Sequence, residues 1–406
     1  MDKIYQLAKN YELGINGVEQ DVLTAYAMHC YLAEQGYALS QYWLGKAYLD
    51  NLFCPLFQQT LFKKPLLPQI IEKLNYSSNI DDDFEAKHAL DRINKCNRYH
   101  AKKLLNLAAE QGLSDALCLL GEISSVDNYG CKNIQESKRL FQLAIDQDNP
   151  QAMCLLGELY AVEGNCQQAV RLYKQAVKLG CVRAVYNLAS CYQDGFGVEK
   201  DSGVSTDMLI VAANDGYNIA QYHLSTRYLE GHRLPKNDKI ALEWCKKSAE
   251  GGYAGAQNSL ASRYVAGSGV RKNYATAIEW YIKAIAFDWP DAYFNLAQLY
   301  ENGHGVKADE KKSLRLYHKA ANKGHVKASR YLGFKYQAIS ATLYNNFLHK
   351  QSKLHKLYPE EQELNDQMVT FYNEQSLYFY QKYELQIKGH RELIGKRKDI
   401  AKLLVI

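Results

Sequence analysis

The chain has 406 residues and a formal charge of +5, from 49 basic and 44 acidic side chains. So balanced a charge gives no argument for nucleic-acid binding, and no apolar run approaches the roughly 18–20 residues that span a membrane. Residues 1–15 do not join a charged segment to an apolar one, so we expect no secretory signal and a cytoplasmic protein.

A 36-residue unit recurs without a gap over residues 183–326, and this period indicates a solenoid. Each copy begins with Ala at a position written here as +0, as in Ala184, Ala220, Ala256 and Ala292. Leu follows at +4, Tyr at +8 and Gly at +11. The first three share one helix face, and the Gly ends the helix because the chain enters a left-handed conformation. A second helix follows and is predicted to stop at Gly216, Gly252, Asp288 or Gly324.

The first predicted repeat covers residues 1–37. Leu7 and Tyr11 hold its Leu and Tyr positions, and a second helix over about 20–35 ends at Gly36. A terminal repeat meets water on one face, so we expect this one to be an atypical cap.

The second repeat is predicted to span 38–114 and to be interrupted by an insert at about 52–100. Its second helix resumes at Ala101 and ends at Gly112. The insert begins as an apolar segment with three prolines, which argues against disorder. We expect a helical insert that folds back into the groove of repeats two to four.

Repeats three to nine are predicted over 115–337, and a C-terminal helical module with a basic tail over 338–406. We expect one helix over 338–357 and another that begins at Pro359 and runs to about 388. Four residues at helical spacing should pack this module on repeat nine: Tyr344, Phe347, Leu354 and Leu357. The segment 388–402 is rich in Lys and Arg.

The pattern A-x-x-x-L-x-x-x-Y-x-x-G-x-G-V, followed by a second helix and another Gly stop, resembles the Sel-one-like repeat family, relatives of the tetratricopeptide repeats. The lines at 256–270 and 292–306 carry the match. The resemblance implies an all-α fold, a right-handed α-solenoid of about eight to nine helix-turn-helix repeats of about 36 residues. It also implies binding to other proteins and no enzymatic activity.

Motifs for catalysis, cofactors and metals are missing from the sequence. There is no phosphate-binding loop, no H-E-x-x-H, no C-x-x-C and no Ser followed by Lys three residues later. The ten cysteines do not pair in register, which predicts free thiols in a reducing compartment. We therefore expect no cofactor and no metal.

Positions +3 and +7 of the first helices flank the packed stripe, and the resemblance implies that they line a concave groove. Repeats five to eight should offer a polar, basic surface for a peptide: Asn187, His223, Arg227, Ser259, Arg263 and Asn295. Repeats two to four should offer an apolar one: Trp43, Leu119, Ile123, Leu155 and Leu159. Each side chain also has a purely structural reading, either in packing or in bonds to a neighbouring turn.

The leading hypothesis is an interaction scaffold that holds a protein segment in its groove. Two arginines one repeat apart, Arg227 and Arg263, could grip an acidic or carboxylate-ended peptide. One alternative is an adaptor recruited to a membrane surface, or an effector exported into a host cell, through the basic tail at 388–406. A second alternative is a hydrolase of an unrecognised kind. No nucleic-acid partner is expected, and the oligomeric state is left open.

Overall fold

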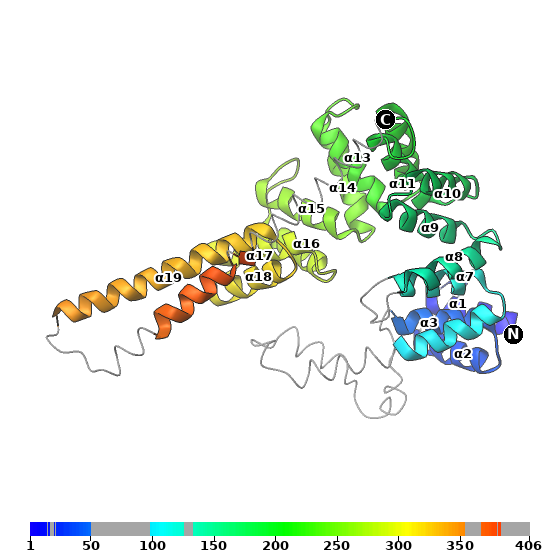
Figure 1. Cartoon of the computed structure of the whole chain (residues 1–406), viewed down its shortest axis with the longest axis horizontal. Coiled ribbons are helices and arrows are strands. Elements are labelled where there is room, and N and C mark those ends of the chain that lie inside the picture. The colour runs from blue at the N-terminus through cyan, green and yellow to red at the C-terminus, as the bar shows by residue number, and fades with distance from the viewer. Residues whose placement is uncertain are drawn as a thin grey trace. The chain divides into compact units, whose positions relative to one another are not determined.

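Pairs of antiparallel helices make up the protein in the computed structural model, which describes residues 1–13, 15–16, 20, 22–49, 98–125, 133–353, 367–379 and 381–382 (Figure 1). These residues form helices and turns and contain no strand, which confirms the predicted all-α repeat fold. No helix within these ranges is long and apolar enough to cross a bilayer. The predictions for the insert at 52–97 and for the tail at 383–406 lie outside the described residues.

The chain divides into two compact units. The first comprises Met1–Cys191 with Gly195–Glu199, and the second comprises Tyr192–Asp194 with Lys200–Ile406. The first unit is built from α1 (Asp2–Leu13), α2 (Val22–Glu34), α3 (Ala38–Leu49), a helix over 98–110, α7 (Ser114–Ser125), α8 (Ile134–Ile145), α9 (Pro150–Val162), α10 (Cys166–Lys178) and most of α11 (Val182–Asp194).

The second unit continues the same alternation of first and second helices. Its elements are α12 (Ser202–Asn214), α13 (Asn218–Glu230), α14 (Asp238–Glu250), α15 (Ala254–Ala266), α16 (Tyr274–Ile285), α17 (Pro290–Asn302), α18 (Glu310–Asn322), α19 (Val326–Lys353) and a helix over 367–379. First helices of successive repeats touch within each unit, α7 with α9 and α15 with α17. Positions on the exposed side of these helices therefore form a continuous surface.

The residues of the 36-residue pattern occupy the places that their spacing predicts. The +0 alanines of repeats five to eight are 0% exposed, and the +4 leucines are at most 4% exposed. The +11 glycines cap the first helices with φ between 66° and 78°. Asp288, where the other repeats have Gly, also has a positive φ of 56°, as predicted.

Short polar side chains start the second helices. Asp201, Asn237, Asn273 and Asp309 each accept a hydrogen bond from a backbone N–H two or three residues further on. A free helix N-terminus leaves such donors without partners, so each cap supplies one and fixes where the helix begins.

The two helices of a repeat approach closely because position +5 of the first helix is small. A Cβ on Gly157 would lie 2.6 Å from the Tyr173 ring, and one on Gly121 would lie 2.6 Å from the Phe141 ring. Both rings belong to second helices and are at most 3% exposed. The large side chain of the second helix thus fills the space that the small residue leaves.

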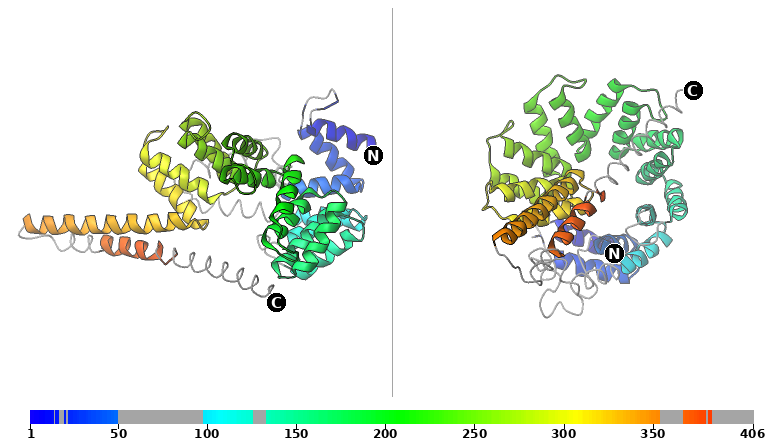
Figure 2. Two further views of the ribbon diagram at one scale, coloured as in Figure 1. Left: turned by 90° about the horizontal axis from the view of Figure 1, so that it is seen from above. Right: turned by 60° about the vertical axis from the view of Figure 1, so that its left-hand side comes forward.

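The C-terminal part differs in detail from its prediction. With no Gly at +11, the first helix of repeat nine does not stop, and it continues as one helix to Lys353. The helix over 367–379 then lies beside α19 (Figure 2). Ser376 Oγ donates to the Gly333 carbonyl, the same bond that Ser137 makes to the Gly121 carbonyl within repeat three. The returning helix therefore takes the place of a second helix.

Aromatic side chains bind the returning helix to the last repeats. Phe379 is 2% exposed and its ring centroid lies 5.1 Å from that of His318 and 5.8 Å from that of Tyr336. Ser340 Oγ also donates to Asn373 Oδ1 at 2.7 Å. The side chains of Tyr344, Phe347, Leu354 and Leu357, which were predicted to make this contact, lie outside the described set.

A buried histidine lies in the first repeats. His29 is 0% exposed, its ring stacks on Trp43 with centroids 4.1 Å apart, and its Nδ1 is 3.1 Å from Ser40 Oγ. Burial lowers the pKa of His29 to about 4, although the nearby carboxylate of Glu12 opposes this change.

Removing the returning helix should destabilise the second unit. A chain that ends after Lys353 keeps α19 but loses the returning helix, which exposes the apolar face of α18 and α19, and Phe379→Ala in the full chain should cost about 3–5 kcal/mol. A chain that ends after Lys382 keeps the helix and serves as the control. Thermal unfolding of the three proteins checks this, and equal melting temperatures for the two truncated chains would refute the capping role.

Acid should destabilise the first unit through His29. Its pKa is below the ordinary value of about 6.5, so between pH 6.5 and 4 the unfolded chain binds a proton that the folded chain does not. The free energy of unfolding should fall by up to about 3 kcal/mol as the pH drops through this range. Denaturant unfolding of the wild type and of His29→Phe at pH 7 and pH 5 measures the difference. An equal fall in both would assign the acid sensitivity to other groups.

Candidate functional site

Asn187 lies in the first unit, where it joins α11 to α9. Its Nδ2 donates to Glu158 Oε1 at 2.8 Å and lies 3.4 Å from Cys154 Sγ. Arg183 also donates two bonds to the Glu158 carboxylate, both at 2.7 Å. The amide predicted to hold a peptide therefore takes part in a polar cluster between repeats four and five.

Ser259 and Asn295 make equivalent bonds in the second unit. Ser259 Oγ donates to the Tyr222 hydroxyl at 3.3 Å, and Asn295 Nδ2 donates to Asn258 Oδ1 at 2.9 Å. In each case position +3 of one repeat bonds to position +2 of the repeat before it. Both side chains stay partly exposed, and an amide has further donor and acceptor capacity, so these bonds do not preclude a ligand.

Arg227 is half-buried, and all of its hydrogen-bond partners among the described residues are neutral side chains. Its guanidinium donates to Gln193 Oε1 and to Ser205 Oγ, both at 3.0 Å, and to Thr206 Oγ1. Within the described ranges no carboxylate lies within ion-pair distance of Arg227. Burial lowers its pKa, but a guanidinium keeps its charge in proteins.

His223 is exposed one helical turn before Arg227 on α13. The protein atoms packed around its ring and then the charge of Arg227 lower the pKa of His223. This change favours the neutral imidazole, which has one donor and one acceptor nitrogen.

Arg263 stands at the same repeat position as Arg227 but in different surroundings. It is 9% exposed, it lies close enough to Cys245 to affect the pKa of that thiol, and its Nη1 has no hydrogen-bond partner among the described residues. Where the repeat before Arg227 has Ser205 and Thr206, the repeat before Arg263 has Ala241 and Leu242. Arg263 is thus a buried cation, and its guanidinium cannot reach a surface ligand without moving.

The predicted apolar surface is part of the core of the first unit. Leu119, Ile123, Leu155 and Leu159 pack in one cluster around α7, α8 and α9. Trp43 packs in a separate cluster with Tyr26 and Leu44. Contacts with other side chains of the first unit therefore already cover much of the predicted apolar surface.

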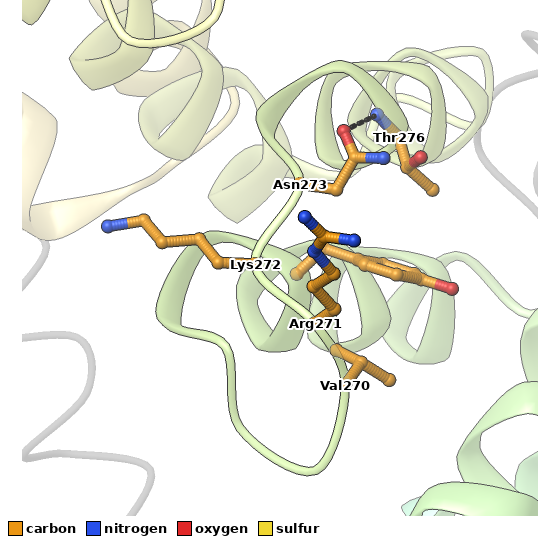
Figure 3. Close-up of a pocket in the computed structure, with 6 residues that line it drawn as sticks. Val270, Arg271, Lys272, Asn273 and Thr276 are labelled. Atoms are coloured by element: carbon orange, nitrogen blue, oxygen red, sulfur yellow. Dashed lines mark hydrogen bonds between the residues drawn. The ribbon is translucent and has the colours of Figure 1, made fainter.

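A basic hollow at the turn between α15 and α16 was not foreseen from the sequence (Figure 3). It has a volume of about 590 Å³ and is lined by Tyr264, Val270, Arg271, Lys272, Asn273 and Thr276. The Asn273 side chain caps α16 (Figure 3), and Lys272 Nζ lies 4.8 Å from the centroid of the Tyr274 ring. The sequence there reads as an ordinary repeat turn, so only the folded chain reveals the hollow. Across the described ranges, no three His, Cys, Asp or Glu side chains form a metal site.

The two arginines should respond oppositely to the same substitution. Arg263→Leu replaces a buried cation by the residue that repeats four and eight carry at this position, and it should stabilise the fold by roughly 1–4 kcal/mol. Arg227→Leu should cost about 1–3 kcal/mol because Ser205 and Gln193 lose their bonds. Denaturant unfolding of both variants measures these changes. Destabilisation by Arg263→Leu would show that its charge supports the fold.

Comparisons with known proteins agree with this architecture. The Sel1 repeat profile matches residues 4–37, 91–113, 114–149, 150–181, 182–217, 218–253, 254–286 and 290–325. A search of curated proteins gives no significant match.

Solved structures with a similar fold include a Sel1 repeat protein from Oxalobacter formigenes. It is 25% identical with a TM-score of 0.47, and the match covers 75% of this chain and 88% of that one. The protective antigen c5321 of uropathogenic Escherichia coli, described as displaying an SLR fold, is 23% identical with a TM-score of 0.37 and coverages of 95% and 94%. Immunity protein Pa5087 from Pseudomonas aeruginosa is 20% identical, with a TM-score of 0.39 and coverages of 52% and 81%. Because the eight profile matches cover more than half of the sequence, the chain belongs to the Sel1 repeat family.

Proposed function

We propose that this chain is a non-enzymatic scaffold that holds a segment of a partner protein against the first helices of its second unit. Sel1 repeats generally mediate protein–protein interactions, and this supports the broad assignment. The observation that carries the finer proposal is the half-buried charge of Arg227, whose described hydrogen-bond partners are all neutral.

The neutral partners of Arg227 favour an anionic ligand. Gln193, Ser205 and Thr206 hold the guanidinium in one orientation but leave its positive charge uncompensated. A side chain that is already oriented loses little conformational freedom when it binds. A carboxylate fits best, because it supplies the missing negative charge and can accept a charge-assisted hydrogen bond from a remaining Nε–H or Nη1–H of Arg227.

The neighbouring side chains suit a peptide rather than a free small anion. His223 is exposed beside Arg227, and Ser259 and Asn295 lie at the same position of the next two repeats. Hydroxyl and amide groups can satisfy the backbone of a bound chain, which must keep its hydrogen bonds when it leaves water. Arg263 contributes positive potential from beneath this surface. The proposed partner is thus an acidic or carboxylate-ended peptide segment, as the sequence suggested.

The proposal keeps the domain boundaries that the sequence predicts. The cap at 1–37, the interrupted repeat at 38–114 and the array at 115–337 would form the scaffold. The module at 338–406 would close it, with 367–382 completing repeat nine.

Arg227→Gln should weaken binding of such a peptide by about 10–100-fold, because one charge-assisted interaction is lost. We would measure fluorescence anisotropy of a library of acidic peptides, each made with a free C-terminal carboxylate and with an amidated end. Amidation should weaken the best binder in the wild type and have little further effect in Arg227→Gln.

Lys335→Gln is the matched control, since Lys335 stands at the same repeat position but pairs with Glu310 at 2.9 Å. If Arg227→Gln and Lys335→Gln bind equally well, the peptide uses another surface. If no member of the library binds, the acidic-peptide specificity is wrong.

A further inference from the structure

Each junction between repeats brings together two particular positions. Position +2 of one first helix faces the residue just before the next first helix, three residues ahead of its +0 position. Ring pairs occupy this junction elsewhere, with centroid distances of 5.4 Å for Tyr5 and Tyr37, 5.3 Å for Tyr222 and Tyr253, and 4.4 Å for Phe294 and His325. The register of the repeats therefore predicts which two side chains meet at any junction.

One junction has cysteine at both positions. Cys154 is at +2 of repeat four on α9, and Cys181 directly precedes α11 of repeat five. No other repeat junction of the sequence carries two cysteines at these positions. The register places the two side chains against each other within the first unit, and the pKa of each thiol depends first on the other.

The surroundings of the two sulfurs differ. Cys154 is 0% exposed and its Sγ contacts Glu158 Oε1 at 3.7 Å. Cys181 is 8% exposed and lies at the N-terminus of α11, with Gln151 Oε1 4.0 Å from its Sγ. Cys181 is thus the thiol that a small reagent can reach, and Cys154 is the buried second thiol.

The electrostatics favour the same assignment. The neighbouring Cys154 thiol lowers the pKa of Cys181 against the effect of burial, with help from the backbone N–H groups of Ala184 and Arg183. The nearby Cys181 sulfur, together with burial, raises the pKa of Cys154. Because the thiolate is the nucleophile, Cys181 reacts first.

We propose that Cys154 and Cys181 form an oxidisable thiol pair, which hydroperoxides convert to a disulfide between repeats four and five. The Cys181 thiolate attacks one peroxide oxygen, the O–O bond breaks, hydroxide leaves and Cys181 becomes a sulfenic acid. The Cys154 sulfur then attacks the Cys181 sulfur, the S–S bond forms and water leaves with the Cys154 proton. The two thiols lose two electrons and two protons in total, and hydrogen peroxide is reduced to two molecules of water.

The disulfide would connect α9 covalently to the start of α11. Because a solenoid is held together only by contacts between neighbouring repeats, a covalent link at one junction restricts its opening. The reaction thus makes this junction sensitive to oxidants, and a thiol reductant reverses it.

The test treats the reduced full-length chain with hydrogen peroxide, blocks the remaining thiols with N-ethylmaleimide and analyses the unreduced digest by mass spectrometry. We expect a Cys154–Cys181 linked peptide that dithiothreitol removes. In Cys154→Ser, Cys181 should stop at the sulfenic acid, which dimedone traps. Cys118→Ser is the matched control, because Cys118 also stands at +2 but faces Asn149, and the linked peptide should persist.

A second measurement needs no variant. The alkylation of each cysteine by iodoacetamide is followed over time in the wild type, and Cys181 should react before the fully buried Cys154. The proposal is overturned if Cys181 forms its disulfide with another cysteine, if both thiols survive excess peroxide, or if Cys154 is alkylated before Cys181.

Discussion

The close approach of the two helices within each repeat is the constraint on which the rest of the structure depends. Where position +5 is glycine, as at Gly45, Gly121 and Gly157, a Cβ would lie within 2.8 Å of a buried side chain of the second helix. That side chain is Leu105, Phe141 or Tyr173. Burial of each such side chain contributes roughly 1.5–3 kcal/mol, and the same contact fixes the rotation of the first helix. Once the rotation of the first helix is set, its positions +2 and +3 lie at the junction with the neighbouring repeat.

The junctions between repeats follow from that rotation. Position +2 packs against the residue before the next first helix, and it accepts a hydrogen bond from +3 of that helix, as in Tyr222 with Tyr253 and Ser259. Such contacts join repeats but use the side chains that sequence reasoning assigned to a ligand. The ability of this surface to bind a ligand therefore depends on the polar groups that are not used in contacts between repeats, above all the charged side chain at +7.

The two arginines show how strongly one neighbouring helix decides the role of a side chain. Arg227 finds Ser205 and Thr206 on the second helix before it and is held half-exposed as a charged donor. Arg263 meets a helix with Ala241 and Leu242 at those positions and is buried without a full set of partners. A mixed array of repeats can in this way vary its surface while each repeat keeps the same core.

The sequence by itself determined the repeat architecture of this protein. Small and large apolar residues at fixed spacing define the buried faces. Gly or Asp288 ends the helices of repeats five to eight, because few other residues adopt a positive φ. These features depend only on residues close together in the chain, so a single sequence is enough to identify them. Only the tertiary structure decided that α19 runs on to Lys353, that residues 367–379 return to cover it, and that Asn187 bonds to Glu158. It also decided that Arg227 and Arg263 differ in exposure. These outcomes depend on which side chains meet across helices far apart in the chain, and periodicity within one helix does not encode that meeting.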